Sequence, residues 1–306
     1  MAGQTGVPDG RTIGSVRILL ATDGSPGADK ALRFLLSLPL SVADHVTVLS
    51  VPRYSFVAGP DGDAAEALPS DPDLRQAAGV VAATASAFFA ARGVPTGTLS
   101  HDGPVSDAIE RAAIERSEEL VVIGSRGLGA IGGVLLGSTG RALARRAPVS
   151  LLVVRELRES PRRILAAVDG SAESDIAMDL LRRLPLSSDV EITLLHVLGE
   201  TDEPEGADEA LFRATRALRG RPVARSIVER GDATDRIVLR ALAGSADLVI
   251  LGSHGQREAH GILRTSVADE VLRRAHCAVL IAKPPLAPRS VSAEVHTGAY
   301  TVLSLA

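Results

Sequence analysis

The strongest constraint on this chain is an internal repeat. Residues 17–41, RILLATDGSPGADKALRFLLSLPLS, align without gaps on residues 163–187, RILAAVDGSAESDIAMDLLRRLPLS. A second pair of similar blocks, LVVIGSRG at 120–127 and LVILGSHG at 248–255, follows in the same order. Similar blocks in a common order indicate one structural unit used twice. We therefore expect two homologous domains.

A charged stretch between the copies, RELRESPRR at 155–163, is typical of a linker. We place the first domain at residues 1–157, the second at 158–285 and a C-terminal tail at 286–306. The full length of 306 residues suits two domains of ordinary size. The tail is Pro-rich and then apolar, which leaves both disorder and docking open.

Each copy alternates short apolar runs with stretches of helical spacing. VRILLAT and LVVIG are apolar throughout, which predicts buried strands. SPGADKALRFLLSL starts with Ser25 as helix N-cap and Pro26 at the first helical position. Buried strands that alternate with helices predict a parallel sheet covered on both faces. The expected fold class is α/β, with two tandem doubly wound domains, each a five-stranded parallel sheet. The expected strand order, 3-2-1-4-5, is what the family resemblance described below implies.

Composition excludes several classes of function. A net charge of −4 and an aromatic content of 2% argue against a nucleic-acid partner. Cys277 is the single cysteine, so no internal disulfide can form. His254, His260 and His276 fit no common metal motif, and we expect no metal site. No signal peptide and no membrane span are recognised, so a cytoplasmic protein with no membrane partner is expected.

Ligands of doubly wound sheets bind at the carboxyl ends of the strands. Asp23, in ATDGS, follows the first strand, and its repeat partner Asp169 lies in AVDGS. Each carboxylate is suited to bind a ribose hydroxyl, an adenine amino group or a metal-bound water. Asp and Ser are also good turn formers, so a purely local role in the turn stays open.

The loop GSRGLGAIGGVLLGST, which starts at Gly124, is rich in glycine and lies between a strand and a helix. Its exposed backbone N–H groups and the positive end of the following helix favour a phosphate. Ser138 is expected to cap that helix or to bind a phosphate oxygen. The GxGxxG at residues 127–132 follows the fourth strand and is absent from the second copy, so it is not a dinucleotide fingerprint.

What remains is the spacing Gly124-x2-Gly127-x9-Gly137-Ser138, together with Asp23. This pattern resembles the ATP-binding class of the universal stress protein family, and the double copy resembles its tandem type. The resemblance implies ATP as ligand, with or without Mg, and ADP or AMP as alternatives. The implied site residues of the first copy are Thr22, Asp23, Val51, Ile123, Gly124, Arg126, Gly127, Gly137, Ser138 and Thr139. Gly124, Gly127, Gly137 and Ser138 would surround the triphosphate, while Val51 would contact the adenine through its backbone.

The second copy departs from the pattern, because Thr265 stands where the first copy has Gly137. If the position requires a positive φ or a close backbone approach, a Thr costs about 1–2 kcal/mol or blocks a phosphate. The motif is therefore degenerate in this copy. Its candidate residues are Asp169, Val197, Gly252, Gly255, Thr265 and Ser266.

Three function classes stay open. The leading one is an ATP-binding regulatory or stress-response protein with an unknown protein partner. The second is a nucleotide-free scaffold that acts through dimerisation or partner binding. The third is a slow adenine-nucleotide hydrolase. No convincing general base and no phosphate-loop lysine occur, so we expect no catalytic residues and at most weak ATPase or autophosphorylation activity.

Two further expectations concern assembly. The strands VSLLVV and CAVLIA close the two copies. The family resemblance implies that such last strands pair, and in a tandem chain we expect them to pair internally about an approximate twofold axis. A homodimer is also possible in this family.

The first copy alone carries a long insertion at residues 52–72, expected as a surface loop, with a lid as the alternative.

Overall fold

The computed structural model describes residues 15–52, 72–125, 136–155, 160–253 and 266–286. The first half contains β1 (Arg17–Ala21), α1 (Pro26–Ser37), β2 (His45–Ser50), α2 (Pro72–Ala90), β3 (Thr96–Ser100), α3 (Val105–Glu115), β4 (Leu120–Gly124), α4 (Ser138–Arg146) and β5 (Ser150–Val154). The second half contains β6 (Arg163–Ala167), α5 (Ala172–Arg183), β7 (Glu191–Leu198), α6 (Glu205–Ala217), β8 (Val223–Arg230), α7 (Ala233–Ala243), β9 (Leu248–Gly252), α8 (Val267–Arg274) and β10 (Ala278–Ala282).

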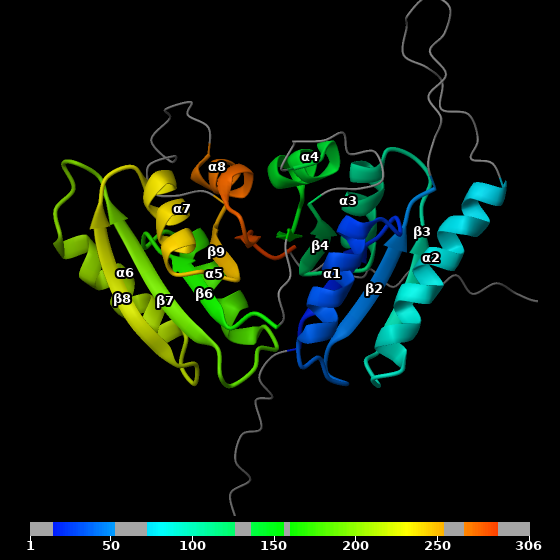
Figure 1. The fold of residues 1–306 in the computed structure, drawn as a ribbon, viewed down its shortest axis with the longest axis horizontal. Coiled ribbons are helices and arrows are strands. Elements are labelled where there is room, and N and C mark those ends of the chain that lie inside the picture. The colour runs from blue at the N-terminus through cyan, green and yellow to red at the C-terminus, as the bar shows by residue number, and fades with distance from the viewer. Residues whose placement is uncertain (1–14, 53–71, 126–135, 156–159, 254–265, 287–306) are drawn as a thin grey trace, which may run out of the picture.

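All ten strands form one sheet, in the order β3-β2-β1-β4-β5-β10-β9-β6-β7-β8 (Figure 1). Within each half the strands are parallel and follow the predicted order. The predicted fold class is therefore confirmed, with the addition that the two five-stranded sheets are continuous.

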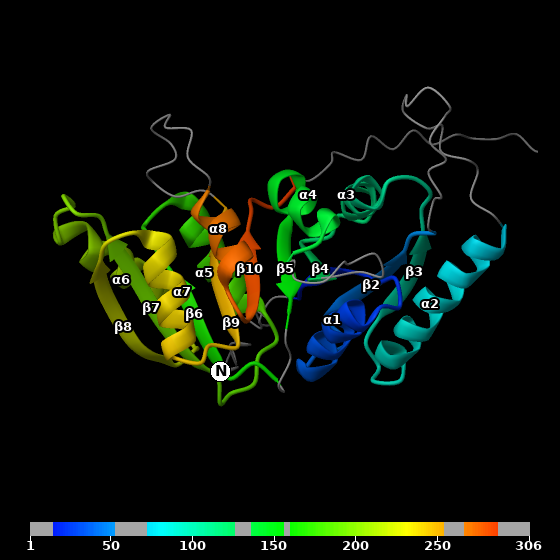
Figure 2. The same cartoon turned by 45° about the horizontal axis from the view of Figure 1, so that its top comes forward.

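The halves meet at an antiparallel pairing of β5 with β10, side by side in Figure 2. Leu152 pairs with Leu280, and Val153 pairs with Val279. In the sequence alignment Leu152 and Leu280 are equivalent residues. Leu120 aligns with Leu248, and Leu152 follows Leu120 by the same number of residues as Leu280 follows Leu248. The approximate twofold axis therefore passes between these two leucines. The predicted internal pairing of the last strands is confirmed.

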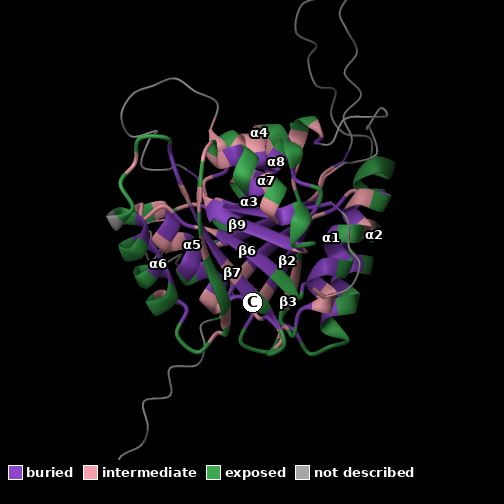
Figure 3. Ribbon diagram, turned by 60° about the vertical axis from the view of Figure 1, so that its left-hand side comes forward, coloured by how far each residue is buried: buried purple, intermediate pink, exposed green. Residues whose placement is uncertain are grey.

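Helices cover both faces of this sheet, and the core consists of two layers. One layer holds buried side chains of α1, α2, α5 and α6, such as Leu35, Phe89 and Met178. The other holds those of α3, α4, α7 and α8, such as Leu143 and Leu272. Each layer contains residues of both halves, so the core continues across the β5–β10 pairing. Figure 3 shows the buried strands between the two helical layers.

The local signals read from the sequence explain how the helices begin. Ser25 Oγ accepts a hydrogen bond from the Ala28 backbone N–H at 3.1 Å, and Pro26 starts α1. The repeat partner Ser171 caps α5 in the same way, through the Ser174 N–H at 3.1 Å. Both caps satisfy a backbone donor that the helix cannot pair itself.

The linker is shorter than the charged stretch suggested. Arg155 is buried, and its guanidinium donates to the Leu272 carbonyl of α8. Arg163 is already the first residue of β6. Arg155 was expected in the linker because charge alone does not distinguish a solvated connection from a buried, paired arginine. Arg163 is exposed at the start of β6, so its charge carried no sign that the strand begins there.

The halves also contact each other near the amino-terminal ends of the strands. There Arg183, the last residue of α5, forms an ion pair with Glu119, the residue before β4. Among the described helices, none is both long enough and apolar enough to cross a membrane.

Candidate functional site

The carboxyl edge of β1 and β4 is where the winding of the first half reverses. β1 pairs with β2 on one side and with β4 on the other, all parallel. The loops that follow β1 and β4 therefore leave the sheet at the same edge. Thr22 continues β1, and its N–H donates to the Leu49 carbonyl of β2 at 2.9 Å. This edge is the usual ligand position of a doubly wound sheet.

Asp23 forms the turn that follows β1. Its Oδ1 accepts a hydrogen bond from the Ser25 N–H at 3.0 Å, and Gly24 has φ +71°. In the second half, Asp169 Oδ1 accepts from the Ser171 N–H at 3.0 Å and from the Ser171 hydroxyl at 2.6 Å. The local role that the sequence left open is thus real, and the ligand role of both carboxylates stays a prediction.

Gly124 ends β4 against the first turn of α1. A Cβ added at this glycine would lie 2.2 Å from the Gly27 carbonyl oxygen and 2.8 Å from the Ala28 nitrogen. In the second half, a Cβ at Gly252 would lie 2.8 Å from Glu173 Cβ. Both glycines are therefore required by packing between a strand end and a helix, a reason that the sequence did not reveal.

Gly137, unlike Gly124 and Gly252, has no close backbone contact with a described helix. Its N–H donates to the Ser125 carbonyl at 3.0 Å, its φ is −69°, and an added Cβ would be 3.6 Å from the Ser125 oxygen. The backbone thus needs neither a positive φ nor a close approach to protein atoms. The condition under which a Thr would strain the backbone is therefore not met in the first half, and no contact with a described residue requires a glycine at this position.

The expectation that Ser138 caps α4 is also wrong. Gly137 is the N-cap, Ser138 is the first helical residue, and among the described residues no side chain caps this end. The first turn of α4 contains no acidic residue. Uncapped N–H groups at a helix N-terminus favour an anion, because the helix dipole places partial positive charge there.

The equivalent end of α8 has the opposite character. Ser266 is its N-cap and accepts a hydrogen bond from the Ala268 N–H at 3.2 Å. Asp269 and Glu270 lie in the first turn. A cap and two carboxylates disfavour a phosphate here. These acidic residues were missed, although the sequence SVADE after the second glycine loop carried the signal.

The other expected site residues have the following positions. Ile123 is buried in β4, and Val51, half-buried just after β2, packs on the layer that contains α3 and α4. Val197 occupies the equivalent place in β7, where it packs on the layer that contains α7 and α8. Thr139 lies in the first turn of α4. Arg126, Gly127, Gly255 and Thr265 lie outside the described residues.

His196 of β7 was not identified from the sequence. The strand registers make it the counterpart of Ser50, which is also buried. His196 is 7% exposed, and within the described part of the chain its Nδ1 has no hydrogen-bond partner. Burial lowers its pKa below the usual histidine value, against the opposing effect of Asp169. A ring thus fills space in the second half that a hydroxymethyl group fills in the first.

Within the described residues, no group of three His, Cys, Asp or Glu side chains is arranged to hold a metal ion.

Two doubly wound halves joined edge to edge, each with a glycine at the end of its fourth strand, define a class of tandem α/β proteins. The model of the Universal stress protein family matches residues 15–155 and 161–283. The chain belongs to this family, with two family domains in tandem.

Individual relatives support this assignment. Universal stress protein Rv2005c of Mycobacterium tuberculosis is 32% identical over 202 residues, which cover 59% of this chain and 66% of that protein. Universal stress protein MT2698 of the same species is 27% identical over 298 residues, covering 89% of this chain and 98% of the relative.

A crystal structure of a universal stress protein from Archaeoglobus fulgidus superposes with a TM-score of 0.66 at 20% identity. The match covers 87% of this chain and 98% of that one. At this identity the likeness establishes the fold.

Proposed function

We propose that the first half binds an adenine nucleotide, ATP in the first instance, and that the protein acts as a nucleotide-dependent regulator. The observation that carries the proposal is the N-terminus of α4. Within the part of the chain that the structure describes, it has no side-chain cap, and its first turn contains no acidic residue. It follows the glycine motif, and Gly137 is tied to Ser125 directly after β4. Membership of the family supports the same ligand class.

The residues at this edge are suited to bind different parts of the nucleotide. The N–H groups of Ser138 and Thr139 and their hydroxyls are suited to bind phosphate oxygens. Each anionic contact at a helix N-terminus is worth roughly 0.3–1 kcal/mol, and up to ~2 when partly buried. Asp23 is suited to accept a hydrogen bond from the ribose or the adenine amino group. Val51 offers backbone groups at the end of β2.

The second half differs at the same place. Its helix N-terminus is capped by Ser266 and carries Asp269 and Glu270. His196 fills the position of Ser50. Both differences weaken a triphosphate site, so we propose one tightly held nucleotide per chain rather than two.

The first experiment is direct. Freshly purified protein is desalted and denatured, and the released ligand is identified by mass spectrometry. ATP is then titrated calorimetrically into the emptied protein, with ADP, AMP and cAMP as competing ligands. Solved structures of a universal stress protein with cAMP and of an Arabidopsis family protein with AMP exist, but TM-scores of 0.33 and 0.32 limit them to suggesting competitors. No released nucleotide and no heat of binding would refute the proposal and leave the scaffold alternative.

The second experiment uses Gly137→Thr, which copies Thr265 of the second half. Because the Gly137 backbone accepts a Cβ, this variant is expected to fold normally and to lose at least about tenfold in ATP affinity. Gly97→Thr in β3 is the matched control, since a Cβ there meets nothing within 4 Å. Unchanged ATP affinity in Gly137→Thr would contradict the proposed role of this loop.

A further inference from the structure

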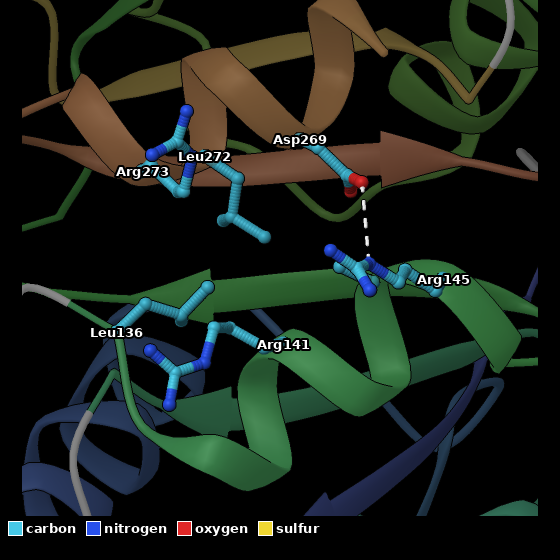
Figure 4. A pocket seen from close by; sticks show the side chains of 7 residues that line it. Leu136, Arg141, Arg145, Asp269, Leu272 and Arg273 are labelled. Atoms are coloured by element: carbon cyan, nitrogen blue, oxygen red, sulfur yellow. Dashed lines mark ion pairs between the residues drawn. The ribbon is translucent and has the colours of Figure 1, made fainter. Parts of the chain in front are cut away.

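A groove runs between α4 of the first half and α8 of the second, close to the approximate twofold axis (Figure 4). Leu136 and Leu272 form part of its apolar wall. Its charged side chains are Arg141, Arg145, Asp269 and Arg273. Three guanidinium groups thus share the groove with one carboxylate.

The twofold relation shows that this charge is unbalanced at one end. Leu120 aligns with Leu248, and the same offset makes Arg141 equivalent to Asp269 and Arg145 equivalent to Arg273. Arg145 pairs with Asp269 across the axis, with Nε and Oδ2 3.8 Å apart. The equivalent pair on the other side of the axis is Arg273 and Arg141. An ion pair on one side therefore corresponds to two positive charges on the other.

The two arginines lie at the same end of the groove, on opposite walls, and their guanidinium groups point apart in Figure 4. Arg273 forms an ion pair with Glu270 on its own helix. Across the described ranges, Arg141 has no ion-pair partner. Two positive charges at one end of a groove repel each other, and this repulsion favours conformations in which they point apart. An anion between them would remove this repulsion.

We propose that this end of the groove binds a phosphoryl group between Arg141 and Arg273, either as a free phosphate compound or as part of a bound nucleotide. Guanidinium groups bind phosphate oxygens through paired N–H donors. Both side chains are exposed, and exposed rotamers interconvert within nanoseconds, so both can turn toward a shared anion. Asp269 lies at the far end of the groove and is paired with Arg145, while Glu270 would give up Arg273 to the anion.

The site joins the two halves. Arg141 lies on α4 and Arg273 on α8, so a phosphate held by both connects helices that belong to different domains of one chain. A ligand that binds only the folded protein raises its stability in proportion to the logarithm of concentration over Kd. Phosphate binding is thus expected to stabilise the packing of α4 on α8.

The test uses inorganic pyrophosphate, titrated calorimetrically into the full chain at low ionic strength, where screening is weak. Arg141→Asp places a carboxylate opposite Arg273, as Asp269 stands opposite Arg145. Arg273→Gln removes the charge contributed by the second half. Each variant is expected to weaken pyrophosphate binding at least about tenfold, since a charge-assisted hydrogen bond contributes on that scale.

Arg92→Asp is the control for net charge, because Arg92 is exposed just beyond the end of α2. It is expected to bind pyrophosphate like the unmodified protein. Equal affinity in the unmodified protein, Arg141→Asp and Arg273→Gln would overturn the proposal, and so would an equal loss in Arg92→Asp.

ATP titrations of the same variants identify the source of the phosphoryl group. If Arg273→Gln weakens ATP and pyrophosphate alike, the phosphate in the groove belongs to the nucleotide of the first half. If only pyrophosphate binding falls, the groove is a separate site. Pyrophosphate binding that survives in a protein unable to bind any nucleotide would support the groove while refuting the proposed function.

Discussion

The ammonium group of Lys283 donates a hydrogen bond to the Ala147 carbonyl oxygen at 2.9 Å. It also donates to the Ala144 carbonyl at 3.0 Å. Lys283 follows β10 of the second half, whereas both carbonyls lie at the carboxyl end of α4 in the first. The relation is reciprocal, because Arg155 follows β5 and donates to the Leu272 carbonyl of α8. Each half thus places a cation on the negative end of a helix in the other half.

Lys283→Met is therefore expected to lower the free energy of unfolding by about 1–3 kcal/mol, the cost of leaving buried acceptors without a charged donor. Urea denaturation measures the effect. Lys30→Met is the matched control, because Lys30 is the only other lysine and is exposed. Equal stability of the two variants would contradict the capping role of Lys283.

Lys283 also gives a signed pH dependence. Burial lowers its pKa below the usual lysine value of 10.5. In the window just below that value the unfolded chain holds the proton more tightly than the folded one, so stability rises as the pH rises through the window. The difference in stability between the unmodified protein and Lys283→Met is expected to grow across this window.

Gly124→Ala tests the contact between β4 and α1. The new methyl group would meet the backbone of Gly27 at 2.2 Å, so helix and strand must separate. We expect a loss of more than about 2 kcal/mol in the free energy of unfolding. Gly137→Ala, where the nearest described atom beyond the neighbouring residues is 3.6 Å away, is expected to cost less than about 1 kcal/mol. Similar losses in both variants would show that the packing role of Gly124 is wrong.

His196→Ser tests the buried ring of β7. Because burial lowers the pKa of His196, the folded state resists protonation, and stability falls as the pH drops below the usual value of 6.5. The variant is expected to lose this part of the acid sensitivity when unfolding at about pH 8 and about pH 5.5 is compared. His276→Ser is the control, since His276 is exposed. An unchanged pH dependence in His196→Ser would be the contradicting result.

Cys277 is expected to be inert in the native protein. It is 4% exposed, and burial raises the pKa of its thiol to about 11. Thiolates react and thiols do not, so a disulfide reagent at about pH 8 should modify the protein only after unfolding. The rate in urea provides the reference, and native labelling at that rate would refute the expectation.

Much of the fold can be predicted from the sequence, because the signals that specify it are local. The Asp-Gly-Ser turns, the caps at Ser25 and Ser171 and the apolar strands depend on neighbouring residues and on burial. The internal pairing of β5 with β10 was also predicted, since a duplicated chain can satisfy its own edge strands. The linker was misjudged at Arg155, whose burial depends on a carbonyl in the other half.

The candidate site, too, could be predicted only in part from the sequence. The sequence singled out Gly124 and Gly137 together, yet only the structure separates them. Gly124 is required by the close Gly27 backbone, whereas no described residue requires a glycine at Gly137. The sequence also shows that the first turn of α8 contains acidic residues and that the first turn of α4 does not. This difference bears on ligand binding only because both helices begin at the carboxyl edge of the sheet.

By itself the sequence determined the duplication, the alternation of strands and helices, the caps of α1 and α5 and the family, since each rests on short-range patterns written twice. The strand order followed from the family resemblance. Tertiary structure alone decided which glycines serve packing and which charges meet across the axis. Arg141, Arg145, Asp269 and Arg273 come together only when β5 pairs with β10. Contacts between residues so far apart depend on the relative position of two folded surfaces, which no local pattern encodes.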